Sequence, residues 1–190
     1  MSSAEIFQRT YSVLVENEPG VLARIAGLFS ARGYNIVSLA VGENQDATGS
    51  RVTIVAEGTP TVLEQINKQL NKIIPVISVL EIPEAEMVSQ ELMLMKFKAD
   101  PAIEEAVRGL FAQGRRVSVV DASERGMILS VVADRRDEAD IFKALEAFSL
   151  IEICRTGEIA LSRERTFGYL EKMRKNTEAQ TEGPGAQGGR

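Results

Sequence analysis

The sequence predicts an α+β fold in which two consecutive βαββαβ halves each form an antiparallel sheet with two helices on one face. Three observations lead to this prediction. Apolar residues repeat in alternating stretches, first with the period of a strand and then with that of a helix. The resulting order of elements occurs twice, at an offset of roughly 80 residues. The length of 190 residues fits two small domains as readily as one large domain.

Residues 9–82 are predicted to form the first half, after a short polar tail at residues 1–8. The predicted strands are β-branched or alternate apolar with polar residues, and the helices carry apolar residues three and four positions apart. Glycine, asparagine and proline mark the breaks between them. In chain order, the elements are a strand at 9–15, a helix at 20–32, strands at 35–41 and 51–56, a helix at 62–73 and a strand at 75–82.

Residues 91–163 repeat this order after a polar, proline-marked linker at residues 83–90. We expect this C-terminal half to be ferredoxin-like as well. Its elements are a strand at 91–97, a helix at 101–113, strands at 117–120 and 127–132, a helix around Ile141 to Phe148 and a strand at 150–154. The extension at 164–190 could form one short helix around Tyr169, but its glycine-rich end predicts a largely disordered segment.

The composition excludes several classes of function. Apolar residues make up 44% of the chain and charged residues 26%, which is typical of a folded globular protein. The formal net charge of −5 and the mixing of both signs argue against a nucleic-acid partner. Because the N-terminus is polar and no apolar stretch reaches the ~20 residues that cross a bilayer, we expect a cytoplasmic protein that does not contact membranes.

The residue types usually needed for catalysis are largely missing. The sequence contains no histidine, which removes serine–histidine and cysteine–histidine pairs, the usual general base and imidazole metal ligands. Its one cysteine, Cys154, lies in an apolar run and is predicted to be a buried small hydrophobic residue. We therefore expect no catalytic residue and no metal site in this chain.

The turn between the first strand and the first helix is the candidate ligand site. A helix N-terminus offers unpaired N–H groups to a carboxylate, and Gly20 permits close approach to the backbone. Asn17 supplies a carbonyl oxygen that suits an ammonium group, so the turn has the partners that an amino-acid zwitterion needs. The same residues are also typical of an ordinary turn that binds no ligand. Asn35 is equally well explained as a residue at the start of a strand whose side chain hydrogen-bonds its own backbone.

A longer stretch around this turn resembles a known family. Residues 13–25 read VLVENEPGVLARI and residues 27–39 read GLFSARGYNIVSL, and the resemblance continues at residues 50–54, 63–72 and 155–163. This pattern is similar to the small regulatory subunit of acetolactate synthase (acetohydroxyacid synthase), whose N-terminal half is an ACT domain. This resemblance covers nearly the whole chain except the C-terminal extension.

The resemblance implies a non-catalytic subunit that binds and activates the catalytic large subunit and makes it sensitive to feedback inhibition by valine, in branched-chain amino-acid biosynthesis. Thiamine diphosphate, Mg²⁺ and FAD are then expected in the catalytic subunit and no cofactor in this chain. It also implies a homodimer formed through ACT edge strands, with valine or another branched-chain amino acid bound between protomers. The implied effector-binding residues are Asn17, Glu18, Pro19, Gly20, Val21, Leu22, Asn35 and Ile36.

Other functions share the βαββαβ order. An acylphosphatase-like hydrolase needs an arginine in the first turn, but the first arginine after that turn is Arg24. An RNA-recognition module needs exposed aromatic residues on its central strands, and aromatic residues make up only 5% of the chain. An ACT-type sensor of another amino acid, acting on a different partner, remains the main alternative.

Overall fold

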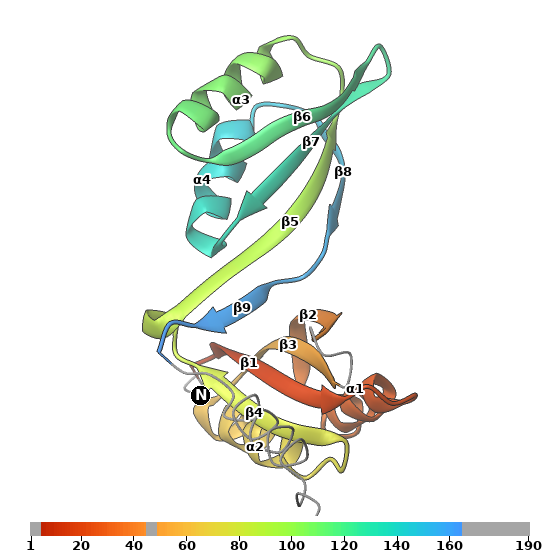
Figure 1. Cartoon of the computed structure of the whole chain (residues 1–190). Helices are drawn as coiled ribbons and strands as arrows, with labels where there is room; N and C mark the ends of the chain where they lie inside the picture. The colour runs from red at the N-terminus through yellow and green to blue at the C-terminus, as the bar shows by residue number, and fades with distance from the viewer. Residues whose placement is uncertain (1–4, 45–48, 165–190) are drawn as a thin grey trace, which may run out of the picture.

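The computed structural model describes residues 5–44 and 49–164, and the first half forms one antiparallel sheet with two helices on one face (Figure 1). Its elements are β1 (Phe7–Glu16), α1 (Val21–Arg32), β2 (Asn35–Glu43), β3 (Gly49–Gly58), α2 (Pro60–Leu70) and β4 (Val76–Ile82). The strand order is β2-β3-β1-β4, which places β2 and β4 at the edges. Each crossover helix thus connects strands that are not neighbours, as the predicted βαββαβ order requires.

The second half repeats this plan and adds one strand. After the short 3-10 helix η1 (Glu84–Glu86), its elements are β5 (Met87–Phe97), α3 (Ala102–Ala112), β6 (Arg116–Ser123), β7 (Gly126–Ala133), α4 (Arg135–Leu145), β8 (Leu150–Arg155) and β9 (Ile159–Ser162). The strand order is β6-β7-β5-β8, and β9 pairs with the first residues of β5. The predicted α+β fold class, with two consecutive βαββαβ halves, is confirmed.

The region between the halves differs from the sequence prediction. Residues 87–90 were expected in a linker, but they form the first part of β5 and pair with β9. The expected final strand at 150–154 is β8, and the chain then continues in the same direction along β5 to form β9 beside the first sheet (Figure 1). A strand of four residues has too short an apolar pattern to be predicted alone, and its pairing partner lies about 70 residues earlier in the chain.

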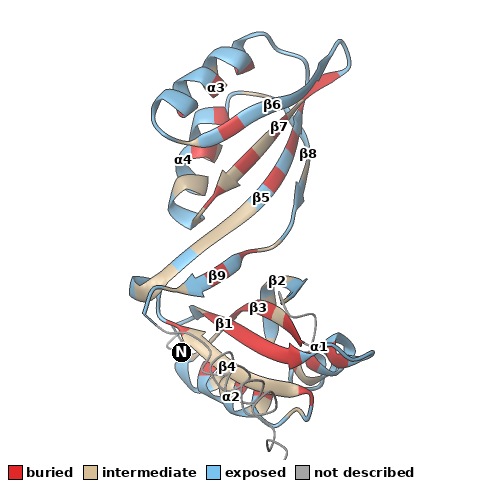
Figure 2. Ribbon diagram, in the orientation of Figure 1, coloured by how far each residue is buried: buried red, intermediate tan, exposed pale blue. Residues whose placement is uncertain are grey.

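Each half has its own hydrophobic core between sheet and helices (Figure 2). In the first half, Tyr11, Ile25, Ile54 and Ile66 are fully buried, and they come from β1, α1, β3 and α2. In the second half, the alternate residues Met93, Met95 and Phe97 of β5 face α3 and α4. Because the two cores share no residue, each sheet holds its own helices in place.

Tyr11 makes a hydrogen bond across the first core. Its hydroxyl is buried and donates a 2.7 Å hydrogen bond to the carbonyl of Leu63 on α2. Burial, together with the negative charge of Glu81, raises the pKa of Tyr11 well above its usual range, so the hydroxyl stays protonated.

Replacing Tyr11 by phenylalanine should lower the free energy of unfolding by about 1 kcal/mol, since a buried hydrogen bond is lost without a change in shape. Urea unfolding measures this difference. Tyr34→Phe is the matched control, because the Tyr34 hydroxyl is exposed and 3.3 Å from Gln65, and this substitution should change stability by less than about 0.5 kcal/mol. Equal effects of the two substitutions would contradict the role given to Tyr11.

The predicted burial of Cys154 is wrong, because the side chain is exposed. Cys154 pairs with Leu94, and both point to the face of the second sheet opposite α3 and α4. Leu94 is also exposed, at 44% of its surface. An apolar alternation shows that a strand has two faces, but it does not show that only one of them is covered.

Some predictions fall partly outside the described part of the chain. The possible helix around Tyr169 and the disordered segment predicted for the extension lie at residues 165–190, beyond the described range. Over residues 5–44 and 49–164, no helix is long and apolar enough to span a membrane. Within the same ranges, no group of three or more potential side-chain ligands is placed to hold a metal ion.

Candidate functional site

The predicted turn lies at one end of the first sheet, where β1 passes into α1. Gly20 is the N-cap of α1 and has φ +88° and ψ −3°, a left-handed conformation that glycine adopts without strain. No atom lies within 4 Å of the position that a Cβ would take on Gly20, so the backbone is open there. The N–H of Val21 makes only a long, 3.4 Å contact with the carbonyl of Glu18. The first-turn N–H groups are thus available to an external acceptor.

Helix α1 also differs from the other α-helices of the described residues in the groups that cap its N-terminus and offset the positive end of its dipole. It has neither a side-chain cap nor an acidic residue in its first turn. Thr59 caps α2, Asp134 caps α4, and α3 has two glutamates in its first turn. The positive end of the α1 dipole is therefore uncompensated, and it favours an anion such as a carboxylate.

Asn17 is held by a residue at the far end of β2. Its Nδ2 donates a 3.1 Å hydrogen bond to Oε1 of Glu43. A carboxylate can only accept, so this contact assigns the amide nitrogen to Glu43 and leaves the Asn17 carbonyl oxygen pointing elsewhere. That oxygen accepts no hydrogen bond from the residues that the structure describes.

Asn35 is held in the same way at the first residue of β2. Its Nδ2 donates to Oε1 of Glu57 on β3, and the side chain is exposed. The next residue, Ile36, is half-buried and packs against the first core. Glu43 and Glu57 were not predicted from the sequence, because they come beside the two asparagines only when β1 and β2 both pair with β3. Among the described residues, the side-chain carbonyl oxygen of each asparagine therefore has no hydrogen-bond donor.

The structure does not bring Asn17 and Asn35 together within one chain. Asn35 pairs with Glu57, which also pairs with Gln8 near the start of β1. Asn17 instead follows the last residue of β1, Glu16, which pairs with Gly49 at the opposite end of β3. With about 3.3 Å per strand residue, the two asparagines lie at opposite ends of the sheet. The predicted residues thus form two separate parts, one with residues 17–22 and one with residues 35 and 36.

The edge strand β2 connects these two parts. In the described part of the chain, β2 forms strand pairs with β3 alone, so its outer edge keeps backbone groups without a strand partner, although Gly157 packs against the carbonyl oxygen of Leu39. The aliphatic side chains of Val37 and Val41 on this strand are 46% and 51% exposed, and Leu22 on α1 is 44% exposed. An open edge flanked by exposed aliphatic residues is typical of a surface that a second chain covers.

Comparison with known protein families gives two matches, which together cover most of the chain. The family model described as the AHAS small subunit-like ACT domain matches residues 11–78, and the model for the small subunit of acetolactate synthase matches residues 90–164.

Relatives and a solved structure cover most of the chain. The acetolactate synthase small subunit of Mycobacterium bovis is 45% identical over 81% of this chain and 91% of its own length. The probable small subunit of Archaeoglobus fulgidus is 42% identical over 82% and 97%. The crystal structure of the small subunit from Thermotoga maritima has a TM-score of 0.73 and 32% identity, covering 84% of this chain and 99% of that one.

Both family models, the extent of the identity and the agreement of the folds point to one assignment. The chain belongs to the acetolactate synthase small subunit family and carries an ACT domain in its first half.

Proposed function

We propose that this chain is the regulatory subunit of acetolactate synthase, that it binds and activates the catalytic large subunit, and that valine inhibits the enzyme by binding here. Its ACT domain, residues 9–82, carries the effector site, and the ferredoxin-like residues 91–163 form the second domain. The matches of the two family models to residues 11–78 and 90–164 support this division. Thiamine diphosphate, Mg²⁺ and FAD belong to the catalytic subunit of this cytoplasmic assembly.

The observation that carries the proposal is the position of the two asparagines on opposite ends of a sheet whose β2 edge is open. A two-fold axis perpendicular to the sheet at Leu39 would pair β2 antiparallel with its copy. Asn35 of the partner subunit would then lie opposite Glu43, and Glu43 already holds Asn17. One symmetric contact therefore completes two equivalent sites, each with residues from both protomers.

The groups gathered in this way suit an amino acid. The uncompensated N-terminus of α1, at residues 20–22, accepts the carboxylate of valine. The free carbonyl oxygens of Asn17 and of the partner subunit's Asn35 accept the ammonium hydrogens, and the negative charge of Glu43 lies beside them. The isopropyl group occupies an apolar gap between the protomers. The remaining predicted residues, Glu18, Pro19 and Ile36, shape the two turns that hold these groups.

Calorimetric titration of the isolated protein with valine, leucine and isoleucine tests the proposal directly. We expect valine to bind with one site per protomer, and the closely related side chains to bind within about 10- to 200-fold, since one methylene contributes only about 1–3 kcal/mol. D-Valine is the control, because its ammonium and carboxylate cannot reach both parts of the site with the side chain in place. Absence of binding by all three L-amino acids would contradict the proposal.

The alternative is an ACT-type sensor of another amino acid that acts on a different partner. The same titration with the remaining amino acids distinguishes the two, since a different ligand would then bind to the same residues. The family assignment favours acetolactate synthase as the partner.

A further inference from the structure

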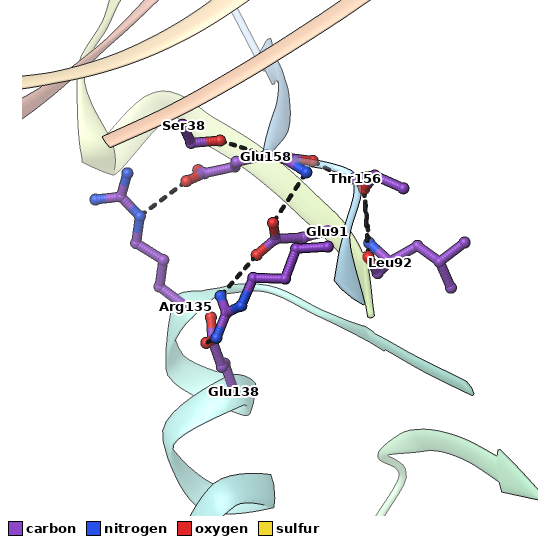
Figure 3. Close-up of polar contacts among 9 residues, drawn as sticks. Ser38, Glu91, Leu92, Arg135, Glu138, Thr156 and Glu158 are labelled. Carbon is purple, nitrogen blue, oxygen red and sulfur yellow. Dashed lines mark hydrogen bonds and ion pairs between the residues drawn. The ribbon is translucent and has the colours of Figure 1, made fainter. Parts of the chain in front are cut away.

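Residues 155–158, the last residue of β8 and the turn before β9, form a polar contact between the two halves of the molecule (Figure 3). The backbone N–H of Glu158 donates a 2.8 Å hydrogen bond to Oγ of Ser38 on β2. Oε2 of the same glutamate accepts a 2.8 Å hydrogen bond from Nε of Arg135, the first residue of α4. Glu158 is only 6% exposed. A single buried residue therefore connects the edge strand of the ACT sheet to a helix of the second domain.

Gly157 shows how closely this segment approaches β2. It has φ +86°, and a Cβ built on it would lie 2.7 Å from the carbonyl oxygen of Leu39. Real Cβ atoms do not approach an oxygen so closely, so only glycine fits between the segment and β2. The contact between the halves is therefore a close backbone packing as well as a set of polar bonds.

The other side of the segment is fixed to the second sheet. The N–H of Gly157 donates a 3.0 Å hydrogen bond to Oε1 of Glu91 on β5, and Arg155 pairs with Oε2 of the same carboxylate at 3.0 Å. Arg155 also pairs with Glu138 on α4, and its guanidinium lies over the Phe142 ring at 5.6 Å. These contacts with both β5 and α4 anchor the segment to the second domain.

Arg135 reaches both halves. Besides its bond to Glu158, its guanidinium donates a 2.9 Å hydrogen bond from a terminal nitrogen to Oε1 of Gln8 on β1. Its backbone position is set by the N-cap of α4, where Asp134 accepts the N–H groups of Arg136 and Asp137. A change in the spacing of the two halves would therefore affect the bond between Arg135 and Gln8 as well as the bond between Glu158 and Ser38.

The contact at Ser38 lies two residues after Ile36, the nearest residue of the proposed effector site. Asn35 and Ile36 begin β2, and the register of β2 with β3 shifts between Ile36 and Ser38. Such a bulge redirects the side chains that follow it, so the geometry at the start of β2 determines where Ser38 points. Ligand contact at Asn35 is thus coupled through a short, irregular stretch of backbone to the bond between Ser38 and Glu158.

The contact is also incompletely satisfied. Oε1 of Glu158 is buried and has no hydrogen-bond partner among the residues that the structure describes. A buried carboxylate oxygen without a partner destabilises the contact between the two halves, whereas the hydrogen bonds to Ser38 and Arg135 stabilise it. Because these two contributions to the free energy of the contact oppose each other, ligand binding can shift the equilibrium between the formed and the broken contact.

We infer that Ser38, Arg135, Gly157 and Glu158 form an interdomain latch that transmits effector occupancy at the start of β2 to the second domain. This inference rests on the proposed function, because it assumes an effector at Asn35. The latch residues touch neither effector nor substrate, so they are positioning residues. In this view, the second domain conveys the state of the ACT domain to the catalytic subunit.

Arg135→Met in the full chain, assembled with the catalytic subunit, tests the latch. We expect valine to bind the isolated variant within about 3-fold of the wild-type dissociation constant, since Arg135 lies outside the effector site. We expect saturating valine to leave the assembled enzyme active. The ratio of valine affinities with and without the catalytic subunit, typically about 5- to 150-fold for coupled sites, should fall to about 1.

Arg136→Met is the matched control. Arg136 follows Arg135 on α4, its side chain is 85% exposed, and its ion pair with Glu84 is 3.7 Å long. This variant should be inhibited like the wild type. Ser38→Ala is a second, milder variant that removes only the acceptor of the Glu158 N–H, and it keeps the test decisive if Arg135→Met does not fold. Ser38→Ala and Arg135→Met should also be non-additive when combined, since both open the same contact.

Full valine inhibition of folded Arg135→Met or Ser38→Ala, equal to that of Arg136→Met, would overturn the latch. A loss of valine binding by the isolated variants, in parallel with the loss of inhibition, would also overturn it, because the residues would then belong to the binding site. Failure of the proposed function gives a different result, since the wild-type chain itself would then bind no branched-chain amino acid.

Discussion

Replacing Gly20 by aspartate will abolish valine inhibition while leaving the assembly with the catalytic subunit intact. The new carboxylate would stand at the N-terminus of α1, where the carboxylate of valine binds in our proposal. Two such charges about 4 Å apart repel each other by about 4 kcal/mol at an effective dielectric constant of 20, which weakens binding by roughly three orders of magnitude. Calorimetry with valine and inhibition of the assembled enzyme measure the effect.

The control for this substitution is Gly20→Asn. Asparagine and aspartate have nearly the same size, and both tolerate the left-handed conformation of Gly20 better than other residues. No atom within 4 Å obstructs a Cβ at this position, so either side chain fits. The two variants therefore differ mainly in charge. If Gly20→Asp binds valine as tightly as Gly20→Asn does, the turn is not part of the effector site.

Replacing Val41 by aspartate will dissociate the proposed homodimer and, with it, remove the proposed valine binding. Val41 lies on the open edge of β2 and is 51% exposed in the single chain. Pairing of two β2 edges would bury the new carboxylate without a partner, at a cost of about 3–5 kcal/mol per unpaired buried charge. The dissociation constant of the dimer should rise by at least about 100-fold, as measured by sedimentation at several protein concentrations.

Val120→Asp serves as the control, because Val120 is 56% exposed and lies on β6, an edge strand of the second sheet. We expect this variant to remain dimeric and to bind valine. Dissociation by Val120→Asp combined with an intact dimer in Val41→Asp would place the dimer contact on the second sheet and contradict the shared effector site.

The elements that sequence patterns predicted well are those determined by neighbours along the chain. The helical stripe that begins at Val21 and ends before Gly33 forms α1, and both glycines adopt left-handed conformations. The predicted strands of the first half differ from the observed ones by at most two residues at either end. Period, capping and turn chemistry are local properties, so a single sequence carries enough information for them.

Predictions failed where the outcome depended on contacts between distant segments. Cys154 is exposed because nothing described here covers the face of the second sheet opposite its helices, and an apolar run does not reveal that. Strand β9 and the first residues of β5 were missed because each is a strand only through the other. The glutamates that orient Asn17 and Asn35 are 26 and 22 residues away, with no local pattern that connects them.

By itself, the sequence determined the α+β class, the repeated βαββαβ order, the family resemblance and the turn at residues 17–22, because each depends on residue type and short-range spacing. Only the tertiary structure decided that Asn17 and Asn35 lie at opposite ends of one sheet, that β2 is an open edge, and that Glu158 joins this strand to α4. Strand pairing and long-range hydrogen bonds set those three features, and they form only when segments far apart in the chain are brought together.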